Sequence, residues 1–200
     1  MSRFDQLALE WDKEQKRVEN ARKIGEAIVS SVPLSEDMNV MDFGAGTGLL
    51  TLYIQPYVKH IDAVDNSEGM LSVLKEKIEK AGIENITPVK KDLEKEDFGE
   101  EKYDLIVSSM TMHHIKNLEN FLKKLYRVLK KGGYIAVADL EKEDGTFHSD
   151  NEGVYHFGFD KNEIVSLFQK AGFKDISIKT VNKIHKNDKD YGVFLIVAKK

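Results

Sequence analysis

One segment limits the possible folds of this chain more than any other: a short apolar run that passes directly into closely spaced glycines. Residues 39–43 have the length and apolar content of a buried strand, Gly44-Ala45-Gly46-Thr47-Gly48 follows at once, and residues 49–54 are again mostly apolar. Glycines between a strand and a helix let a ligand approach the backbone, and the helix N-terminus favours a negatively charged group. The segment therefore predicts an α/β fold with a binding loop after its first strand.

The same order of strand and helix recurs along the chain. Apolar runs predict further strands at residues 61–64, 86–89, 103–107 and 134–138. Between them, one helix is expected from the Ser67 cap to Gly82, and another from Leu118 to a stop at Gly132, with Lys130 and Lys131 at its negative end. Such alternation predicts an α/β, doubly wound, Rossmann-like sheet with right-handed crossovers.

The final third of the chain departs from this alternation. Asp160 and Glu163 have the spacing of a capping box, which predicts a helix that ends at Gly172. Strands are then expected at residues 176–181 and 193–198, with the charged residues 182–190 as their connection. No helix separates these two strands, so they should pair antiparallel. The complete prediction is a seven-stranded sheet, mostly parallel, with an antiparallel last strand.

Composition excludes several classes of function. The chain has no cysteine, which removes disulfides, thiolate metal sites and cysteine nucleophiles. Its 30 basic and 34 acidic residues give a net charge of −4, unlike the basic surface of a nucleic-acid binder. No apolar run approaches the roughly 20 residues of a membrane span. We therefore expect a cytoplasmic protein, a monomer or homodimer, with no nucleic-acid partner and no membrane insertion.

The glycine loop also indicates the kind of ligand. A dinucleotide-binding turn needs G-x-G-x-x-G, but Leu49 occupies the last of these positions, and no Gly-Lys-Ser/Thr ending of a P-loop follows Gly48. Asp42, on the strand before the loop, can accept hydrogen bonds from an ammonium group, whereas the loop N–H groups favour an anion. An amino acid moiety carries both charges, so a ligand of that kind is expected.

These residues together resemble motif I of the class I S-adenosylmethionine-dependent methyltransferases. Gly132-Gly133 before the fifth strand and residues 170–173 before the sixth are also typical of the family, so that the resemblance covers about residues 35 to 200. It is closest in appearance to quinone-biosynthesis and other small-molecule methyltransferases. The resemblance implies a donor-binding methyltransferase domain at 35–200 and an N-terminal helical lid at 1–34, within a single domain overall.

The resemblance also implies which residues bind the donor, S-adenosyl-L-methionine. Asp65 matches the ribose-binding acid, and Asp92 and Leu93 match the pair that binds adenine. Ser108 and Ser109, at the end of the fourth strand, match the position whose carbonyl often receives the methionine ammonium. Asp65 and Asp92 could instead be cap or turn carboxylates, and Trp11 could either cover the donor or fix the N-terminal helix. The complete expected set is Trp11, Asp42, Gly44, Ala45, Gly46, Asp65, Asn66, Met70, Asp92, Leu93 and Ser108.

Four histidines fall in segments that should border the same edge of the sheet. His113 and His114 follow the fourth strand, and His148 and His156 lie in the polar insertion, residues 141–158. Histidine is suited to take a proton near neutral pH, so all four are candidate catalytic residues. His148 and His156 are favoured as base or acceptor ligand, since His113 and His114 could simply shape the floor of the site. A less favoured hypothesis has some of these histidines bind a divalent metal with Asp139 or Glu141.

The resulting prediction is a methyltransferase (EC 2.1.1.-) that transfers a methyl group to a small-molecule acceptor. Two alternatives stay open: a non-catalytic S-adenosylmethionine-binding protein, and a methyltransferase that acts on protein or RNA. The acidic balance argues against nucleic acid, and the fourth strand ends in Ser108-Ser109-Met110-Thr111 rather than in the Asn/Asp-Pro-Pro-Tyr/Phe motif of nucleic-acid amino methyltransferases. Whether oxygen, nitrogen, sulfur or carbon receives the methyl group is not predicted.

Overall fold

The computed structural model describes residues 3–92 and 94–200, so that Leu93, an expected adenine contact, lies outside the described residues. The elements in chain order are α1 (Arg3–Leu7), η1 (Ala8–Lys13), α2 (Gln15–Ser31), β1 (Asn39–Phe43), α3 (Leu49–Ile54), η2 (Gln55–Tyr57), β2 (His60–Asp65), α4 (Glu68–Ala81), β3 (Ile86–Lys90), β4 (Tyr103–Ser109), η3 (Met112–His114), α5 (Leu118–Val128), β5 (Leu129–Leu140), α6 (Lys161–Ala171), β6 (Lys174–Lys186) and β7 (Lys189–Lys199).

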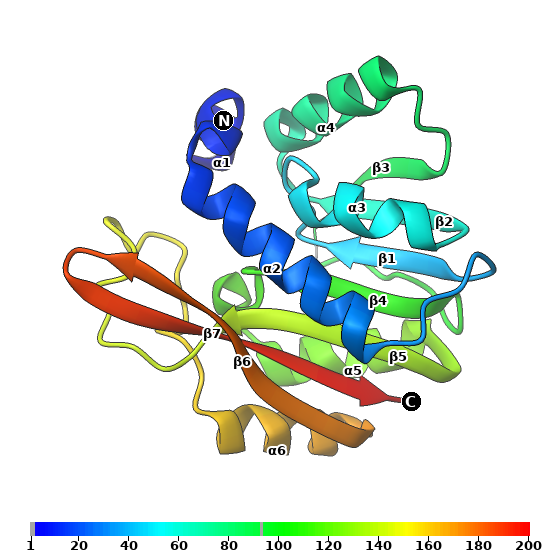
Figure 1. The fold of residues 1–200 in the computed structure, drawn as a ribbon. Coiled ribbons are helices and arrows are strands. Elements are labelled where there is room, and N and C mark those ends of the chain that lie inside the picture. The colour runs from blue at the N-terminus through cyan, green and yellow to red at the C-terminus, as the bar shows by residue number, and fades with distance from the viewer. Residues whose placement is uncertain (1–2, 93) are drawn as a thin grey trace.

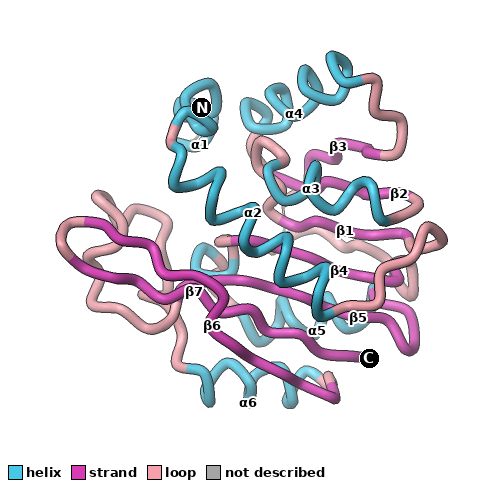
Figure 2. Tube along the Cα trace, in the orientation of Figure 1, coloured by secondary structure: helices cyan, strands magenta, loops and turns pink. Residues whose placement is uncertain are grey.

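The strands form one seven-stranded sheet between two layers of helices (Figures 1 and 2). The strand order is β3-β2-β1-β4-β5-β7-β6, and among the described strands only β7 runs in the direction opposite to the rest of the sheet. Helices α2, α3 and α4 cover one face, and α5 and α6 cover the other (Figure 1). The predicted fold class, a doubly wound, mostly parallel sheet with an antiparallel last strand, is confirmed.

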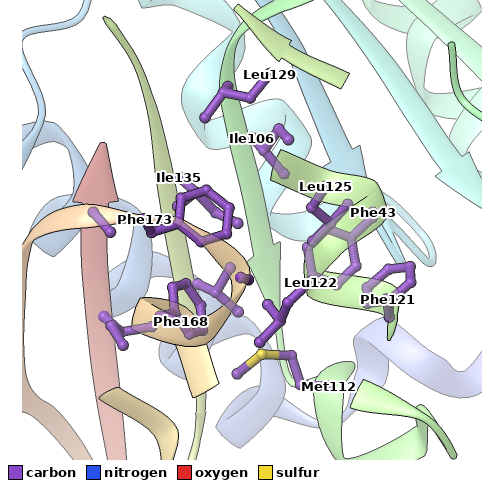
Figure 3. Packing of buried hydrophobic residues seen from close by; sticks show 14 of the residues in the cluster. Phe43, Ile106, Met112, Phe121, Leu122, Leu125, Leu129, Ile135, Phe168 and Phe173 are labelled. Carbon is purple, nitrogen blue, oxygen red and sulfur yellow. The ribbon is translucent and has the colours of Figure 1, made fainter. Parts of the chain in front are cut away.

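Each face of the sheet has its own hydrophobic core. Successive strand side chains point to opposite faces, so that Val40 of β1 packs with α2, α3 and α4, whereas Phe43 packs with α5. Figure 3 shows the second core, where Phe43 and Ile106 of the sheet meet Phe121 of α5 and Phe168 of α6. These cores fix the strand ends, and hence the edge of the sheet at which loops from several strands meet.

Two element boundaries differ from the sequence prediction. Helix α5 ends at Val128 instead of at Gly132, because β5 already begins at Leu129 and pairs there with Tyr103. Lys130 is therefore in a strand, where its ammonium group pairs with the Asp104 carboxylate at 2.9 Å, instead of stabilising a helix end.

The last two strands are also longer than predicted. Residues 182–190, expected to be a charged connection, form the outer half of a long β6–β7 hairpin. Its turn consists of Asn187 and Asp188, whose φ angles of 52° and 58° are of the kind that these two residue types tolerate in tight hairpin turns. The hairpin contacts the insertion 141–158, since Tyr191 Oη lies 2.6 Å from Thr146 Oγ1.

None of the helices within residues 3–92 and 94–200 combines the length and the apolar character that crossing a membrane requires.

Candidate functional site

A cavity of about 730 Å³ lies at the carboxyl ends of the parallel strands. Residues at the ends of β1, β2, β3 and β4 form one part of its wall, and η3, the insertion and the hairpin form another. The N-terminal segment, residues 3–34, supplies a third part through side chains between Arg3 and Ala21. Ligands of open α/β sheets bind at this edge of the sheet.

The glycine loop turns sharply at the end of β1. The N–H groups of Gly44 and Ala45 both donate to Val64 O, at 2.8 and 3.1 Å, which holds the loop against β2. Gly44 has φ +67°, and a Cβ there would lie 2.2 Å from Thr111 Oγ1, so that only glycine fits. Gly46 has φ +55°, but a Cβ there would meet no atom within 4 Å. The loop is thus closely packed at its first glycine and open toward the cavity at its second.

Two carboxylates stand beside this loop, Asp42 buried and Asp65 half-buried. Asp65 Oδ2 accepts the N–H of Gly46 at 2.8 Å, and Oδ1 accepts the N–H of Ser67 at 2.8 Å. Burial raises the pKa of Asp65. Asp42 Oδ2 accepts the hydroxyl of Thr51 at 2.6 Å, and burial raises the pKa of Asp42 to about 7. Each carboxylate keeps lone pairs for further hydrogen bonds, and both line the cavity.

Most of the expected donor-binding residues border this cavity, whereas Ser108 does not. Those that border the cavity are Trp11, Asp42, Gly44, Ala45, Gly46, Asp65, Asn66, Met70 and Asp92. Ser108 is instead buried, with its hydroxyl donating to Phe43 O at 2.7 Å, and the next residue, Ser109, borders the cavity. Asp92 pairs with Lys95 at 2.9 Å, and mainly this contact lowers the pKa of the Asp92 carboxyl.

The N-terminal segment is fastened to the loops of the donor side. Asp5 Oδ1 accepts the hydroxyl of Ser67 at 2.6 Å and the N–H of Gly69 at 2.9 Å. Asp12 Oδ1 accepts the hydroxyl of Thr47, in the glycine loop, at 2.6 Å. Residues 3–13 therefore connect to both the β1 and the β2 loops, a role that the sequence analysis did not assign to either aspartate.

Trp11, within this segment, borders the cavity. The Arg17 guanidinium carbon is 3.8 Å from the centroid of the Trp11 ring, and Phe4 meets the same ring edge-on at 5.9 Å between centroids. Phe4 also contacts the ring of His114 at 5.3 Å. The aromatic residues of the N-terminal segment thus extend from the donor side toward the histidines.

Three of the four candidate histidines form a cluster in the cavity wall. The centroids of His113 and His114 are 4.2 Å apart, and those of His113 and His148 are 4.9 Å apart. The structure does not bring His156 to this cluster: its Nε2 donates to Ile115 O at 2.9 Å, and it is not among the residues that line the cavity.

His113 is buried and paired with a buried carboxylate. Its Nδ1 lies 2.7 Å from Asp139 Oδ1, and its backbone N–H donates to Oδ2 at 3.2 Å. Burial raises the pKa of Asp139, but His113 and the N–H of Leu140 outweigh burial and lower it overall. An ionised carboxylate only accepts hydrogen bonds, so Nδ1 of His113 donates to it and Nε2 is the ring nitrogen that remains for a ligand. No described residue is hydrogen-bonded to His113 Nε2.

The other two histidines of the cluster are neutral near pH 7. Burial lowers the pKa of His114 to about 4, and burial likewise lowers the pKa of His148 to about 4. His114 Nδ1 donates to Gly153 O at 2.8 Å. Nε2 of His148, like that of His113, is buried without a hydrogen-bond partner in the described part of the chain. Buried polar atoms are seldom left unpaired, so two such nitrogens in one cavity wall indicate a ligand site.

Within residues 3–92 and 94–200, no three side chains of His, Cys, Asp or Glu are arranged to hold a metal ion. Asp139, considered above as a metal ligand, instead orients His113. The sequence signal for this role was the position of Asp139 at the carboxyl end of a predicted strand, where side chains reach the ligand edge.

Comparisons with known proteins agree with this architecture. Residues 40–133 match a family described as "Methyltransferase domain". An uncharacterized methyltransferase of Schizosaccharomyces pombe is 35% identical over 156 residues, which are 70% of this chain and 55% of the relative. The demethylmenaquinone methyltransferase of Bacteroides fragilis is 31% identical over 52% of this chain and 44% of its own length. The chain spans about half the length of these curated relatives.

The fold has close counterparts among solved structures. A chain from the Haloferax volcanii complex with the Trm112 methyltransferase activator has a TM-score of 0.83 at 16% identity, with coverage of 100% of this chain and 98% of that chain. At such low identity the match concerns the fold alone. Residues 40–133, which include the glycine loop, Asp65 and His113, thus match a methyltransferase domain in sequence, and the whole chain shares the fold of this solved structure.

Proposed function

We propose that this protein transfers the methyl group of S-adenosylmethionine to a hydroxyl, thiol or amine of a small molecule, with His113 as the base. The observation that carries the proposal is the buried His113–Asp139 pair, whose free nitrogen belongs to the same cavity wall as the glycine loop. Sequence reasoning favoured His148 and His156, but His148 is a weak base at a pKa of about 4.

The residues at the carboxyl ends of β1 and β2 fit the donor. The open space beside Gly46 leaves room for a ligand against the backbone, and Asp42 can accept from an ammonium group. Asp65 has lone pairs left for the two ribose hydroxyls. When bound, the donor supplies an activated methyl group on a positively charged sulfur. The cavity volume of about 730 Å³ is within the range of small-molecule sites.

The chemical role of the dyad follows from its charges. His113 Nε2 takes the proton that the acceptor loses, and the ionised Asp139 stabilises the imidazolium that forms. Asp139 also fixes the ring, because both of its oxygens accept hydrogen bonds from His113. The rings of His114 and His148 pack beside the His113 ring, and His113 Nε2 is a buried atom, so in this proposal the acceptor enters between these side chains.

The N-terminal segment, residues 3–34, serves in this proposal as the lid of the site. Its aspartates bind the donor-side loops, and Phe4 contacts His114 on the acceptor side. A lid that reaches both ends would exclude water once both ligands are bound, and exclusion of water protects an activated methyl group from hydrolysis.

The first test is isothermal calorimetry with S-adenosylmethionine and with its demethylated product, S-adenosylhomocysteine. We expect both to bind, and the absence of binding would overturn the proposal. Turnover is then followed as release of S-adenosylhomocysteine in the presence of a panel of small hydroxyl, thiol and amine compounds. Donor binding without any release across the panel would favour the non-catalytic alternative.

The role of the base is tested with His113→Ala and Asp139→Asn. Both should lower turnover by about a hundredfold or more, while the dissociation constant of the donor stays unchanged. A matched control is His60→Ala, since His60 lies at the amino end of β2, away from the cavity. Wild-type turnover by His113→Ala would exclude His113 as the base. His156→Ala tests the sequence prediction for that residue in the same assay.

A further inference from the structure

Two lysines stand at the histidine end of the cavity. Lys16 of α2 and Lys186, at the end of β6, both border it. Lys16 Nζ donates to His185 O, and Lys186 Nζ donates to Phe147 O, each at 2.7 Å. Main-chain carbonyls therefore hold both ammonium groups at this rim.

The charge of these two lysines is not neutralised by a neighbouring acid. The two arginines that border the cavity are ion-paired, Arg3 with Asp150 at 3.4 Å and Arg17 with Glu14 at 2.8 Å. Neither lysine is within ion-pair distance of a carboxylate in the part of the chain that the structure describes. Each ammonium has three N–H donors and uses one on a carbonyl, so donors remain for an anion.

The lysines are continuous with the proposed base. Lys186 Nζ lies 5.3 Å from the centroid of the Phe147 ring, which is 4.9 Å from that of His148, and the His148 ring is 4.9 Å from that of His113. Glu143 is near this wall but does not line the cavity: its Oε2 accepts the N–H groups of Thr146 at 2.9 Å and Phe147 at 3.1 Å, whereas its Oε1 is buried without a hydrogen-bond partner among the described residues. The Lys186 ammonium, the Phe147 ring and the unpaired Nε2 atoms of the two histidines thus follow one another along this side of the cavity.

We propose that the methyl acceptor is an anion, with a carboxylate or phosphate ester on an apolar or aromatic body. The anionic group binds Lys16 and Lys186, the body lies against Phe147 and Ile184, and the group to be methylated points toward His113. This inference rests on the proposed function and adds the chemical class of the acceptor. The opposite end of the cavity is acidic, so its charge favours the cationic donor and disfavours an anionic acceptor there.

The cavity contains its own probe, because Trp11 is the only tryptophan of the chain and lines the wall. With S-adenosylhomocysteine saturating the donor side, Trp11 fluorescence is followed during titration with benzoate, phenyl phosphate and uncharged benzamide. Benzoate or phenyl phosphate should bind about tenfold more tightly than benzamide, and added salt should weaken only the anions. The ratio of the two anions distinguishes a carboxylate site from a phosphate site.

Variants then assign the preference to the two lysines. Lys186→Met and Lys16→Met each remove a charge but keep an apolar stem, and each should weaken anion binding about fivefold without changing benzamide binding. Lys186→Arg should keep the preference for the anions. Lys183→Met is the matched control, because Lys183 is an exposed residue of the same strand that does not border the cavity.

Equal affinity for benzoate, phenyl phosphate and benzamide would overturn the inference, and so would the absence of detectable binding of both anions. An unchanged ratio of anion affinity to benzamide affinity in both Lys186→Met and Lys16→Met would also overturn it. If one of the variants folds poorly, the other still gives this test. Calorimetry with S-adenosylhomocysteine alone keeps the two proposals apart. Loss of that binding contradicts the proposed function, whereas intact binding without anion preference contradicts only the class of acceptor.

Discussion

The two ends of the cavity are built in different ways. At the donor end, the glycine loop and Asp65 lie directly at strand ends, and backbone N–H groups make most of the contacts. At the acceptor end, η3, the insertion 141–158 and the β6–β7 hairpin meet through side chains such as Lys186 and His148. The donor end therefore depends on local chain geometry, and the acceptor end depends on contacts between segments far apart in sequence.

The two ends also differ in the charge that they bury. Asp42 and Asp65 have raised pKa values at the donor end, and His114 and His148 have lowered pKa values at the acceptor end. Burial disfavours the charged form in all four cases, which is why acids and bases shift in opposite directions. Substitutions at either end should consequently affect stability with opposite dependence on pH.

The largest effect is expected at the first glycine of the donor loop. Gly44→Val would force a β-branched residue into φ +67° and place its Cβ 2.2 Å from Thr111 Oγ1. We expect no calorimetrically detectable binding of S-adenosylhomocysteine, with circular dichroism to test whether the fold is kept. Gly46→Ala is the matched variant, since its methyl group meets no atom within 4 Å and should weaken binding without unfolding the chain. Wild-type affinity in both variants would show that the loop does not bind the donor.

The next effect is expected at Asp65. Removal of its carboxylate in Asp65→Ala should weaken S-adenosylhomocysteine binding by about 1–3 kcal/mol, which corresponds to roughly five- to 150-fold. The same variant loses the hydrogen bond to Gly46, so loss of affinity by itself does not establish a ribose contact. The 2′-deoxy analogue of the ligand separates the two effects. If Asp65 binds the ribose, wild type should discriminate against the analogue and the variant should not.

The difference in construction explains how much of the site the sequence revealed. The spacing of glycines and the position of Asp65 after a strand are local features, and the structure places both at the predicted edge. The position of Asp139 after a predicted strand indicates only that it reaches the ligand edge; its pairing with His113, 26 positions away, has no signal in periodicity or spacing. For the same reason, sequence analysis could not tell that His148 reaches the cavity while His156 bonds to Ile115 O.

The fold shows the same division between local and distant signals. Caps at Ser67 and Asp160 formed as predicted, because each side chain accepts N–H groups within its own first helical turn. The predicted end of α5 was wrong, because Lys130 already belongs to β5, where it pairs with Asp104 of the neighbouring strand β4. The hairpin at 182–190 was also missed, since its strands are mostly polar and are stabilised by pairing with each other.

At the donor end, Asp42→Asn should increase stability at alkaline pH. The folded chain retains the Asp42 proton up to about pH 7, whereas the unfolded chain loses it near pH 4. The stabilising contribution of Asp42 is therefore complete below about pH 4 and is lost as the pH rises through about 7. Asparagine stays uncharged, so urea unfolding should give a free energy about 1–3 kcal/mol above wild type at about pH 8. The gain should shrink toward about pH 5, and equal gains at both pH values would contradict the assignment.

At the acceptor end, His148→Phe should show the smallest effect. Its gain in stability should appear at acid pH, whereas that of Asp42→Asn appears at alkaline pH. The unfolded chain protonates this histidine near pH 6.5, whereas the folded chain does so only at about pH 4. Its contribution to the free energy of unfolding is present above about pH 6.5 and is lost as the pH falls toward 4. Because His148 is only half-buried, solvent screens the effect, and we expect a relative gain below about 1 kcal/mol near pH 5.

Urea unfolding of wild type, Asp42→Asn and His148→Phe over one pH series tests the comparison directly. The aspartate variant should gain relative to wild type on the alkaline side, and the histidine variant on the acid side, so each serves as the control for the other. Gains on the same side would mean that a general change in net charge, rather than burial at two distinct ends of the cavity, sets the response. A gain for Asp42→Asn alone would place His148 in water, and the free nitrogen in the acceptor wall would then lose its significance as a ligand site.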